Sequence, residues 1–328
     1  MDSAPAWMIS ILAAVIPTVV YVFVLWWFDR YEREPRRLLF SAFFWGAVPA
    51  VLLAVVAEEV LGIPAGALGA MGSELVSSSF LAPLFEEVAK GLAVFAIFLL
   101  FRCEFDDVLD GIIYGATVGF FAMTENVFYF LSSLESSGVE GLSFLVLMRA
   151  AVFGLNHALF TAIFGATLGY ARTAKSGGLR VLVPVLGLLG AMFLHGVHNL
   201  FAVLTSVTCF SLLLGLLSDW GGVLVIFVVI ALAWQQEKRW ISTNLQPEVD
   251  NGLLTQAEYD MIRSYRNRLK ARWQAWSRGD FGAARQLGKL SQLATELAFK
   301  VEQGDERTAQ KLRAQIAAVR GLPAAQRQ

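Results

Sequence analysis

Seven apolar runs, each about as long as a membrane-spanning helix, follow one another along the first part of the chain. They cover roughly residues 6–28, 38–60, 80–101, 108–132, 148–171, 180–204 and 219–236. A helix needs about 20 consecutive apolar residues to cross the hydrocarbon core of a bilayer. The pattern therefore predicts an all-α fold, a polytopic membrane bundle of about seven transmembrane helices.

The stretch 205–218, TSVTCFSLLLGLLS, is apolar but too short for an ordinary span. We interpret it as an interfacial or re-entrant piece before the last span. An eighth span at this place is the alternative, and it would move the C-terminal tail to the other side of the membrane. The predicted bundle therefore has seven to eight helices.

The C-terminal part of the chain shows a different pattern, that of short amphipathic helices. Leu, Ala and aromatic residues recur at helical spacing over residues 254–276, 280–301 and 305–320, which Gly279 and Gly304 separate. We expect a small helical bundle that packs on itself. A basic face that touches anionic lipid is the alternative, and the sequence shows no nucleic-acid-binding motif.

Charge divides the chain at the same place. Residues 1–237 carry 10 Lys and Arg against 18 Asp and Glu, a net charge of −8, whereas residues 238–328 carry 16 against 9, a net charge of +7. The overall net charge of −1 hides this difference. We therefore predict a transmembrane domain over 1–237 and a basic, cytoplasmic helical domain over 238–328.

Lys and Arg in the short connections set the predicted orientation. The odd-numbered connections carry Arg30, Arg33, Arg36, Arg37, Arg102, Arg172 and Lys175, and the tail begins with Lys238 and Arg239. The even-numbered connections offer only Arg149. Because positively charged loops stay in the cytoplasm, we expect the N-terminus outside and the C-terminus in the cytoplasm. The first run has no basic region before it, so we interpret it as a retained span.

Four of the predicted spans carry polar side chains that hydrocarbon would exclude. They are Glu86, Glu87, Lys90, Glu125, Asn126, Asn156, His157, His195, His198 and Asn199, and they include all 3 histidines of the chain. In the predicted orientation one residue of each span lies 6 to 9 residues from the outer end: Glu86, Glu125, His157 and His195. At 1.5 Å per residue these side chains lie about 9–14 Å below the outer surface. Polar groups at one depth on four helices indicate a shared intramembrane site.

Helical spacing groups the charged residues of the third run. Lys90 follows Glu86 by four residues and Glu87 by three, so it can neutralise one carboxylate and leave the other for chemistry. Pro83 suits the first turn of a helix, which makes it a candidate start. That start would place both glutamates near the positive N-terminal end of the helix.

A second group of polar residues shares a face, and a second acidic pair does not belong to the site. His195, His198 and Asn199 are three and four residues apart, so they lie on one side of a helix. Glu58 and Glu59 instead end the second run just before a Gly/Pro turn. The membrane interface can hydrate that pair, and we assign it no catalytic role.

Carboxylates, histidines and amides at one depth can activate a water molecule and stabilise an oxyanion, which is what peptide hydrolysis requires. The sequence contains no GxSxG, no HExxH and no pair of intramembrane Asp. Serine, HExxH-type zinc and aspartyl mechanisms are therefore disfavoured. Two versions of the site stay open: Zn²⁺ held by His157, His195 and Glu86 with a free position for water, and a glutamate-activated water without metal.

Four separated motifs also resemble one known family. They are Glu86-Glu87-x-x-Lys90, GFFAMTEN with Glu125-Asn126, Phe153-x-x-x-His157 and His195-x-x-x-Asn199. The first is similar to the EExxK signature of the PrsW family of intramembrane proteases, which is related to the CAAX prenyl-protease and bacteriocin-processing group. That group has an Arg one position after Lys90, so prenylated substrates are disfavoured. The resemblance covers roughly residues 10–205 and leaves the tail outside.

The resemblance implies a protease of the bacterial inner membrane that makes the first, outside-facing cut in a membrane-anchored anti-sigma factor. We assign the role of general base to Glu86, with Glu87 as its electrostatic neighbour. His157 and His195 would orient the water or stabilise the oxyanion. The other positions follow by role: Glu125 and Asn199 complete the catalytic shell, and Lys90, Asn126 and His198 support it.

A proton- or ion-coupled transporter is the alternative function, because buried Glu and His also form proton relays. Transporters usually show inverted repeats, and none is visible in this sequence. A scaffold that has lost activity is a third interpretation. For the protease we expect two partners, a single-pass membrane protein substrate and the lipid bilayer. We expect the cut in the outer third of the substrate helix or just outside it, with the Gly- and Ser-rich stretch 62–78 as a gate.

Overall fold

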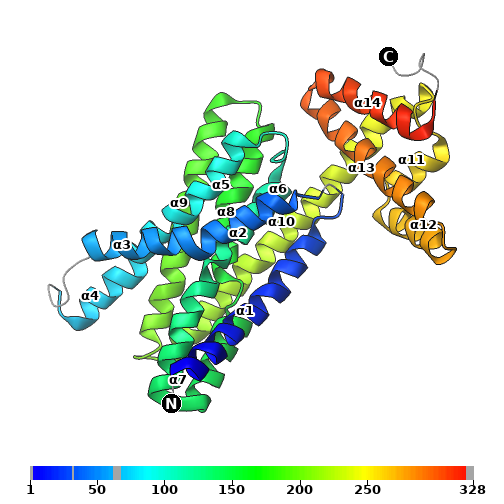
Figure 1. Cartoon of the computed structure of the whole chain (residues 1–328). Helices are drawn as coiled ribbons and strands as arrows, with labels where there is room; N and C mark the ends of the chain where they lie inside the picture. Colours follow the sequence, from blue (N-terminus) through cyan, green and yellow to red (C-terminus); the bar gives the residue numbers. More distant parts are fainter. Residues whose placement is uncertain (1–2, 32, 62–67, 323–328) are drawn as a thin grey trace. The chain divides into compact units, whose positions relative to one another are not determined.

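The computed structural model describes residues 3–31, 33–61 and 68–322. Every regular element within these ranges is a helix, so the predicted all-α class is confirmed for them. The chain divides into two compact units, residues 1–28 with 34–229 and residues 29–33 with 230–328. In Figure 1 the first unit runs from blue to yellow-green, and the second comprises a short blue segment at 29–33 and the yellow to red part of the chain.

Ten helices contribute to the described part of the first unit. They are α1 (Ser3–Phe28), α2 (Arg36–Trp45), α3 (Val51–Leu61), α4 (Ala70–Val76), α5 (Ala82–Leu100), α6 (Val108–Val118), α7 (Ala122–Val146), α8 (Asn156–Thr173), α9 (Gly177–Leu204) and the first part of α10 (Cys209–Asp250). Short π or 3-10 turns continue the helical path at Gly46–Ala50, Ser77–Leu81, Gly119–Phe121 and Leu147–Val152.

Five helical stretches of the described chain are long and apolar enough to cross a membrane. They are Ala4–Phe28, Arg36–Leu61, Val108–Thr173, Gly177–Leu204 and Cys209–Asp250. Helix α5 is not among these five stretches, because it carries three charged residues, Glu86, Glu87 and Lys90, within its 19 residues. The exact number of spans, seven or eight, stays a prediction.

Helix α5 begins at Ala82, close to the expected start, but its first turn is not a free helix end. Pro83 lies in the first turn of α5, but Leu81 before it is already helical, with φ −72° and ψ −47°. The π-helical turn Ser77–Leu81 joins α5 to α4 without a break. The backbone N–H groups of the first turn of α5 therefore do not form a free, positive helix end beside the two glutamates.

Two other boundaries also differ from the prediction. Residues 209–218 belong to the 42-residue helix α10, so 205–218 is not a separate interfacial piece. Helix α7 continues to Val146, well past the predicted end at 132, and bends at Gly138, whose φ is 68°. Part of the proposed gate, residues 62–67, lies outside the described residues.

Close packing of α6 against α8 fixes the centre of the first unit. The backbones approach so closely that a Cβ on Gly111 would lie 2.0 Å from the carbonyl oxygen of Gly165. A Cβ on Gly119 would lie 2.3 Å from the carbonyl oxygen of His157. Only glycine permits this approach, and it holds the first turn of α8, with Asn156 and His157, in a defined place.

The second unit is a cluster of shorter helices after α10. They are α11 (Gln256–Ile262), α12 (Tyr265–Ser277), α13 (Phe281–Gln303) and α14 (Glu306–Arg320). Gly279 and Gly304 end α12 and α13 with φ near 76° and 74°, as the sequence suggests. The expected single helix over 254–276 is two helices, because the Ser264 hydroxyl caps a new start by accepting from Asn267 N–H.

The core of this unit contains apolar side chains from α10, α11, α13 and α14. Ile241, Leu245, Ile262, Leu297 and Ile316 are fully buried in it. Burial lowers the pKa of Arg268, also in this unit, to about 10.

The predicted boundary at 237 and 238 falls inside α10, and the division into domains stays a prediction.

Candidate active site

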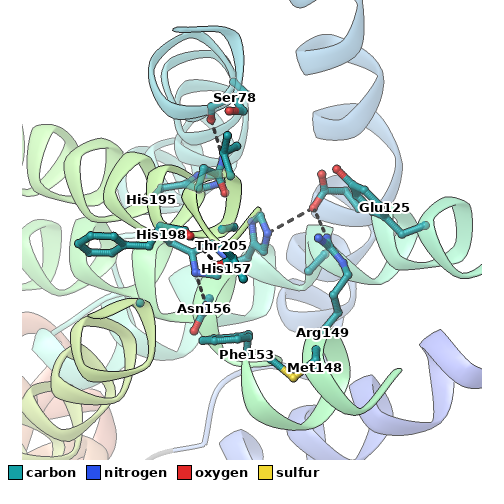
Figure 2. Close-up of a pocket in the computed structure, with 18 of the residues that line it drawn as sticks. Ser78, Glu125, Met148, Arg149, Phe153, Asn156, His157, His195, His198 and Thr205 are labelled. Atoms are coloured by element: carbon teal, nitrogen blue, oxygen red, sulfur yellow. Dashed lines mark hydrogen bonds and ion pairs between the residues drawn. The ribbon is translucent and has the colours of Figure 1, made fainter. Parts of the chain in front are cut away.

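A cavity of about 690 Å³ in the first unit collects most of the polar residues singled out from the sequence. Its lining includes Glu86, Glu125, Asn126, Asn156, His157, His195, His198 and Asn199. Figure 2 shows His157 between the Glu125–Arg149 side and the His195–His198 side of this pocket. Side chains of α5, α7, α8 and α9 thus converge on one volume, as the shared-site hypothesis requires.

Two predicted site residues lie behind the pocket wall. Glu87 is 1% exposed and Lys90 is 0% exposed. The Lys90 ammonium lies 2.5 Å from Glu87 Oε1 and 3.4 Å from Glu86 Oε2. A lone buried carboxylate is costly in this environment, and an ammonium between the two carboxylates offsets that cost.

Glu87 holds His195 in one orientation. Its Oε1 lies 2.9 Å from His195 Nδ1, and its Oε2 accepts a 3.1 Å hydrogen bond from the Thr161 hydroxyl. The Phe160 ring stacks on the His195 ring with centroids 4.9 Å apart. Since Glu87 occupies Nδ1, the other nitrogen of His195 is the one available to Glu86, at 3.9 Å from its Oε2.

His157 is the second imidazole beside Glu86. Its Nδ1 lies 3.7 Å from Glu86 Oε2 and 3.3 Å from Lys90 Nζ. Its Nε2 lies 3.3 Å from Glu125 Oε2. The His157 and His195 ring centroids are 4.8 Å apart, so both imidazoles and Glu86 form one cluster.

Arg149 ties Glu125 and Asn126 together, a role that sequence reasoning missed. The Arg149 Nε donates a 2.7 Å hydrogen bond to Asn126 Oδ1, and its Nη2 lies 3.5 Å from Glu125 Oε2. Its guanidinium lies 3.9 Å from the centroid of the Tyr129 ring. The signal was present in the sequence, because Arg149 is the only cation of the even-numbered connections.

A second missed residue, Asp219 of α10, anchors His198. Asp219 is 2% exposed, and its Oδ2 lies 2.7 Å from His198 Nδ1. It also accepts a 2.9 Å hydrogen bond from Asn156 Nδ2, which in turn lies 3.0 Å from His198 Nδ1. Asp219 is the only charged residue between 209 and 236, and that isolation was the available signal.

Asn199 and Glu58 also line the pocket. Helical spacing in the sequence predicted neither the contact that Asn199 makes nor the position of Glu58. Asn199 Nδ2 donates a 2.7 Å hydrogen bond to the carbonyl oxygen of Ser78, which attaches α9 to the π-helical turn before α5. Glu58 lines the same pocket as Glu86, whereas Glu59 is exposed. Only Glu59 therefore lies clear of the site.

The cluster of Glu86, His157 and His195 suits a divalent metal. One potential ligand atom from each of the three residues lies within 4.8 Å of the others. Two imidazoles and one carboxylate are the ligand set of many zinc hydrolases. The contact between Glu87 and His195 Nδ1 is the kind of outer contact that orients a metal-binding imidazole, so the residues present fit such an ion.

Comparison with known proteins shows the family of this chain. A sequence model of PrsW family intramembrane metalloproteases matches residues 34–234. This chain belongs to the PrsW family. Protease PrsW of Geobacillus kaustophilus (strain HTA426) is 32% identical over 190 residues, which are 58% of this chain and 77% of that protein. Protease PrsW of Bacillus subtilis (strain 168) is 30% identical over 193 residues, or 58% and 80%. No solved structure matches the chain.

Membership of the PrsW family makes this protein an intramembrane protease, and its apolar helices make it a multi-pass membrane protein. The match to the family ends at residue 234 and so leaves α11 to α14 outside it. The transporter interpretation is not favoured. The role of each site residue and the identity of the substrate are not given by family membership.

Proposed function

We propose that this PrsW family protein hydrolyses a peptide bond of a membrane-anchored protein near the outer face of the bacterial inner membrane. The observation that carries the proposal is the cluster of Glu86, His157 and His195 in the wall of a polar cavity inside an apolar bundle. Such a cavity supplies both water and the groups that activate it.

In the proposed reaction Glu86 is the general base. It takes a proton from a water molecule as the water oxygen attacks the carbonyl carbon of the scissile peptide bond. The C–N bond then breaks, and the proton passes from Glu86 to the leaving amine. His157 and His195 lie on either side of Glu86 and would orient the water or stabilise the developing oxyanion.

The residues around the cluster keep it in position. Glu87 and Lys90 fix His195 and compensate the buried charge. Glu125 holds His157 from the other side. In the alternative version of the site, Glu86, His157 and His195 would hold a divalent metal as its ligands, and that metal would supply Lewis-acid polarisation of the carbonyl and a more acidic water in place of the free base.

Substrate and topology follow from the charge pattern and the predicted depth of the site. The chain would lie with its N-terminus outside and its C-terminus in the cytoplasm, and the substrate would be a single-pass protein such as an anti-sigma factor. A continuous substrate helix shields its own carbonyl groups. We therefore expect the cut in the extracytoplasmic juxtamembrane segment or the outer third of the substrate helix.

Purified full-length protein in nanodiscs, given a tagged single-pass substrate, tests the proposal. Sequencing the new N-terminus of the anchored fragment gives the site of the cut. A cut in the inner half of the substrate helix would contradict the proposed geometry. Absence of any cut with several substrates of both topologies would contradict the catalytic assignment.

A further inference from the structure

Helix α12 of the second unit buries an arginine and exposes tryptophans, the reverse of what a soluble helix does. Arg268 is its one buried residue, at 6% exposure. Leu269, Trp273 and Trp276 are instead 47%, 65% and 54% exposed. In the described residues beyond 232, the only other large apolar side chain that is exposed is Phe281, at 59%.

Arg268 fixes which side of α12 faces the rest of the unit. Its Nε donates to the Ile262 carbonyl oxygen at 2.5 Å, and its Nη2 donates to the Thr295 hydroxyl of α13 at 2.6 Å. These bonds satisfy the guanidinium inside the unit. Arg268 therefore lies on the side of α12 that faces the core of the unit, and the exposed apolar side chains lie on the side that faces away from it.

The exposed apolar side chains form one continuous patch, which we call the aromatic stripe (Leu269, Trp273, Trp276 and Phe281). At about 100° per residue, the three side chains on α12 fall within an arc of about 60°. The Trp273 and Trp276 rings are stacked with centroids 5.3 Å apart, and Phe281 meets Trp276 edge-on at 6.1 Å. An exposed patch of this kind marks a binding surface.

The segment that carries the aromatic stripe is strongly basic. Residues 263–295 carry eight Lys and Arg side chains and a single carboxylate, that of Asp280, which gives a net charge of +7. Helical spacing places Arg266 and Arg272 about 60° to either side of the stripe centre, and both are exposed. An anionic partner with an apolar layer beneath its charges would match this surface.

We propose that the aromatic stripe of α12 docks on anionic lipid headgroups of the membrane in which the chain is embedded. Tryptophan prefers the interface between headgroups and acyl chains, where its ring is buried and its N–H stays wet. A helix with Leu and Trp on one face and Arg and Lys at its borders lies in that interface with its apolar face inserted by about 5–10 Å. Covalent attachment to a multi-pass bundle keeps the bilayer permanently within reach.

Fluorescence of the full-length protein in nanodiscs tests the docking. Cys103 and Cys209 are exposed and are replaced by Ser, and Ser277→Cys carries an environment-sensitive dye beside the stripe. The nanodiscs contain either phosphatidylcholine alone or phosphatidylcholine with about a third of anionic phosphatidylglycerol. Both kinds also contain a lipid with a spin-labelled headgroup, which quenches the dye. We expect at least about threefold stronger quenching with phosphatidylglycerol, lost at high salt because exposed charges are screened.

Matched variants separate the stripe from the general positive charge of the tail. Trp273→Ser with Trp276→Ser should abolish the quenching, and Arg266→Gln with Arg272→Gln should weaken it. Arg307→Gln with Lys311→Gln removes the same charge from α14, where both side chains are exposed, and should leave the quenching intact. A dye at Gln310→Cys on α14 should not be quenched. Melting temperatures show whether each variant keeps its fold.

Three results would overturn the docking proposal. Equal quenching in both lipid compositions would show that docking does not depend on anionic headgroups. Equal loss in the α14 charge variant would make the effect one of net charge and not of α12. No quenching together with energy transfer between labelled copies would show that a second copy of the chain covers the stripe.

Discussion

At the scale of single residues, Glu86 and Glu87 are neighbours with different surroundings. Glu87 is enclosed by Lys90, His195 and Thr161, whereas Glu86 lines the cavity. The carboxylate that faces the cavity can meet water, and the enclosed one can only orient its partners. This difference is our reason for proposing Glu86 as the base and Glu87 as a residue that positions its partners.

Replacement of the cluster residues tests that assignment. Glu86→Gln, His157→Ala and His195→Ala should each insert normally and lower kcat by a factor of about 10² or more, because general base catalysis and water positioning are lost. Cleavage of the tagged substrate measures the effect. Glu59→Gln, an exposed glutamate on α3, is the matched control and should cleave like the natural protein. Normal cleavage by Glu86→Gln would place the base elsewhere.

Asp219 should act through His198. Asp219→Ala removes the acceptor for both His198 and Asn156, so we expect kcat/KM to fall by about tenfold through loss of positioning. Asp219→Asn keeps an oxygen of the same size in place and should restore part of the activity. Separate kcat and KM values distinguish this role from a general loss of folding, which would lower the amount of active enzyme without changing KM. Unchanged kinetics of Asp219→Ala would mean that His198 needs no anchor.

Metal dependence is also decided at the residue scale. If Glu86, His157 and His195 hold Zn²⁺, the purified protein should contain about one zinc ion per chain. A chelator should abolish cleavage, and added Zn²⁺ should restore it. The His195→Ala variant should lose bound zinc as well as activity. Full activity in stringent chelator, with no metal in the protein, would support the glutamate-activated water alone.

The sequence predicted contacts within one helix much better than contacts between helices. The spacing of Glu86 and Lys90 is a fixed property of the α-helix, so their proximity could be stated in advance. The meeting of Asn156, His198 and Asp219 depends on how three helices rotate about their axes. One sequence carries no information on that rotation beyond the polarity of each side chain, so Asp219 was overlooked.

At the scale of helices, the contact between α6 and α8 should be the least tolerant part of the fold. Gly111→Ala places a Cβ 2.0 Å from the Gly165 carbonyl oxygen, and backbone on both sides leaves no flexible group to move. We expect a loss of stability of about 1–3 kcal/mol from overpacking, with a parallel loss of activity because α8 carries His157. Thermal unfolding in detergent measures the first and substrate cleavage the second.

Gly190 on α9 provides the control for this substitution. A Cβ there would meet nothing within 4 Å, and the alanine also favours the helix. Gly190→Ala should therefore be neutral or slightly stabilising. If both substitutions behave alike, the close approach of α6 and α8 does not limit stability.

Helix existence was predictable, and helix ends were not. The apolar runs identified every long helix of the first unit because length and hydrophobicity alone decide which segments can span a bilayer. Polar helical segments outside the bilayer, such as 133–146 of α7, cannot be found by length and hydrophobicity, so the end of α7 was not predicted. Ser264 likewise divides the expected tail helix by a local hydrogen bond that hydrophobic periodicity does not register.

At the scale of the whole molecule, the charge distribution leads to a topology that can be tested directly. Reporter fusions after Arg37 and at Gln328 should both read as cytoplasmic, because Lys and Arg concentrate in those connections. A fusion at Ser136, in the second half of α7, should read as extracytoplasmic. An extracytoplasmic signal from Gln328 would contradict the orientation and, with it, the expected cut near the outer face.

A buried apolar cluster of the first unit, which includes Val94, Phe164 and Leu168, has a consequence for the passage of ions. Val94 lies 8 residues beyond Glu86 on α5, and Phe164 lies 7 beyond His157 on α8. A Cβ on Gly91 would touch Phe164 at 3.2 Å, so these two segments run side by side. About 10–12 Å further along both helices, the cluster consists of rings and branched side chains, and it includes Tyr114, whose hydroxyl donates a hydrogen bond to Glu34. Val94 and Phe164 are buried in this layer, so it excludes water, and proteolysis inside the membrane need not let ions leak through the bundle.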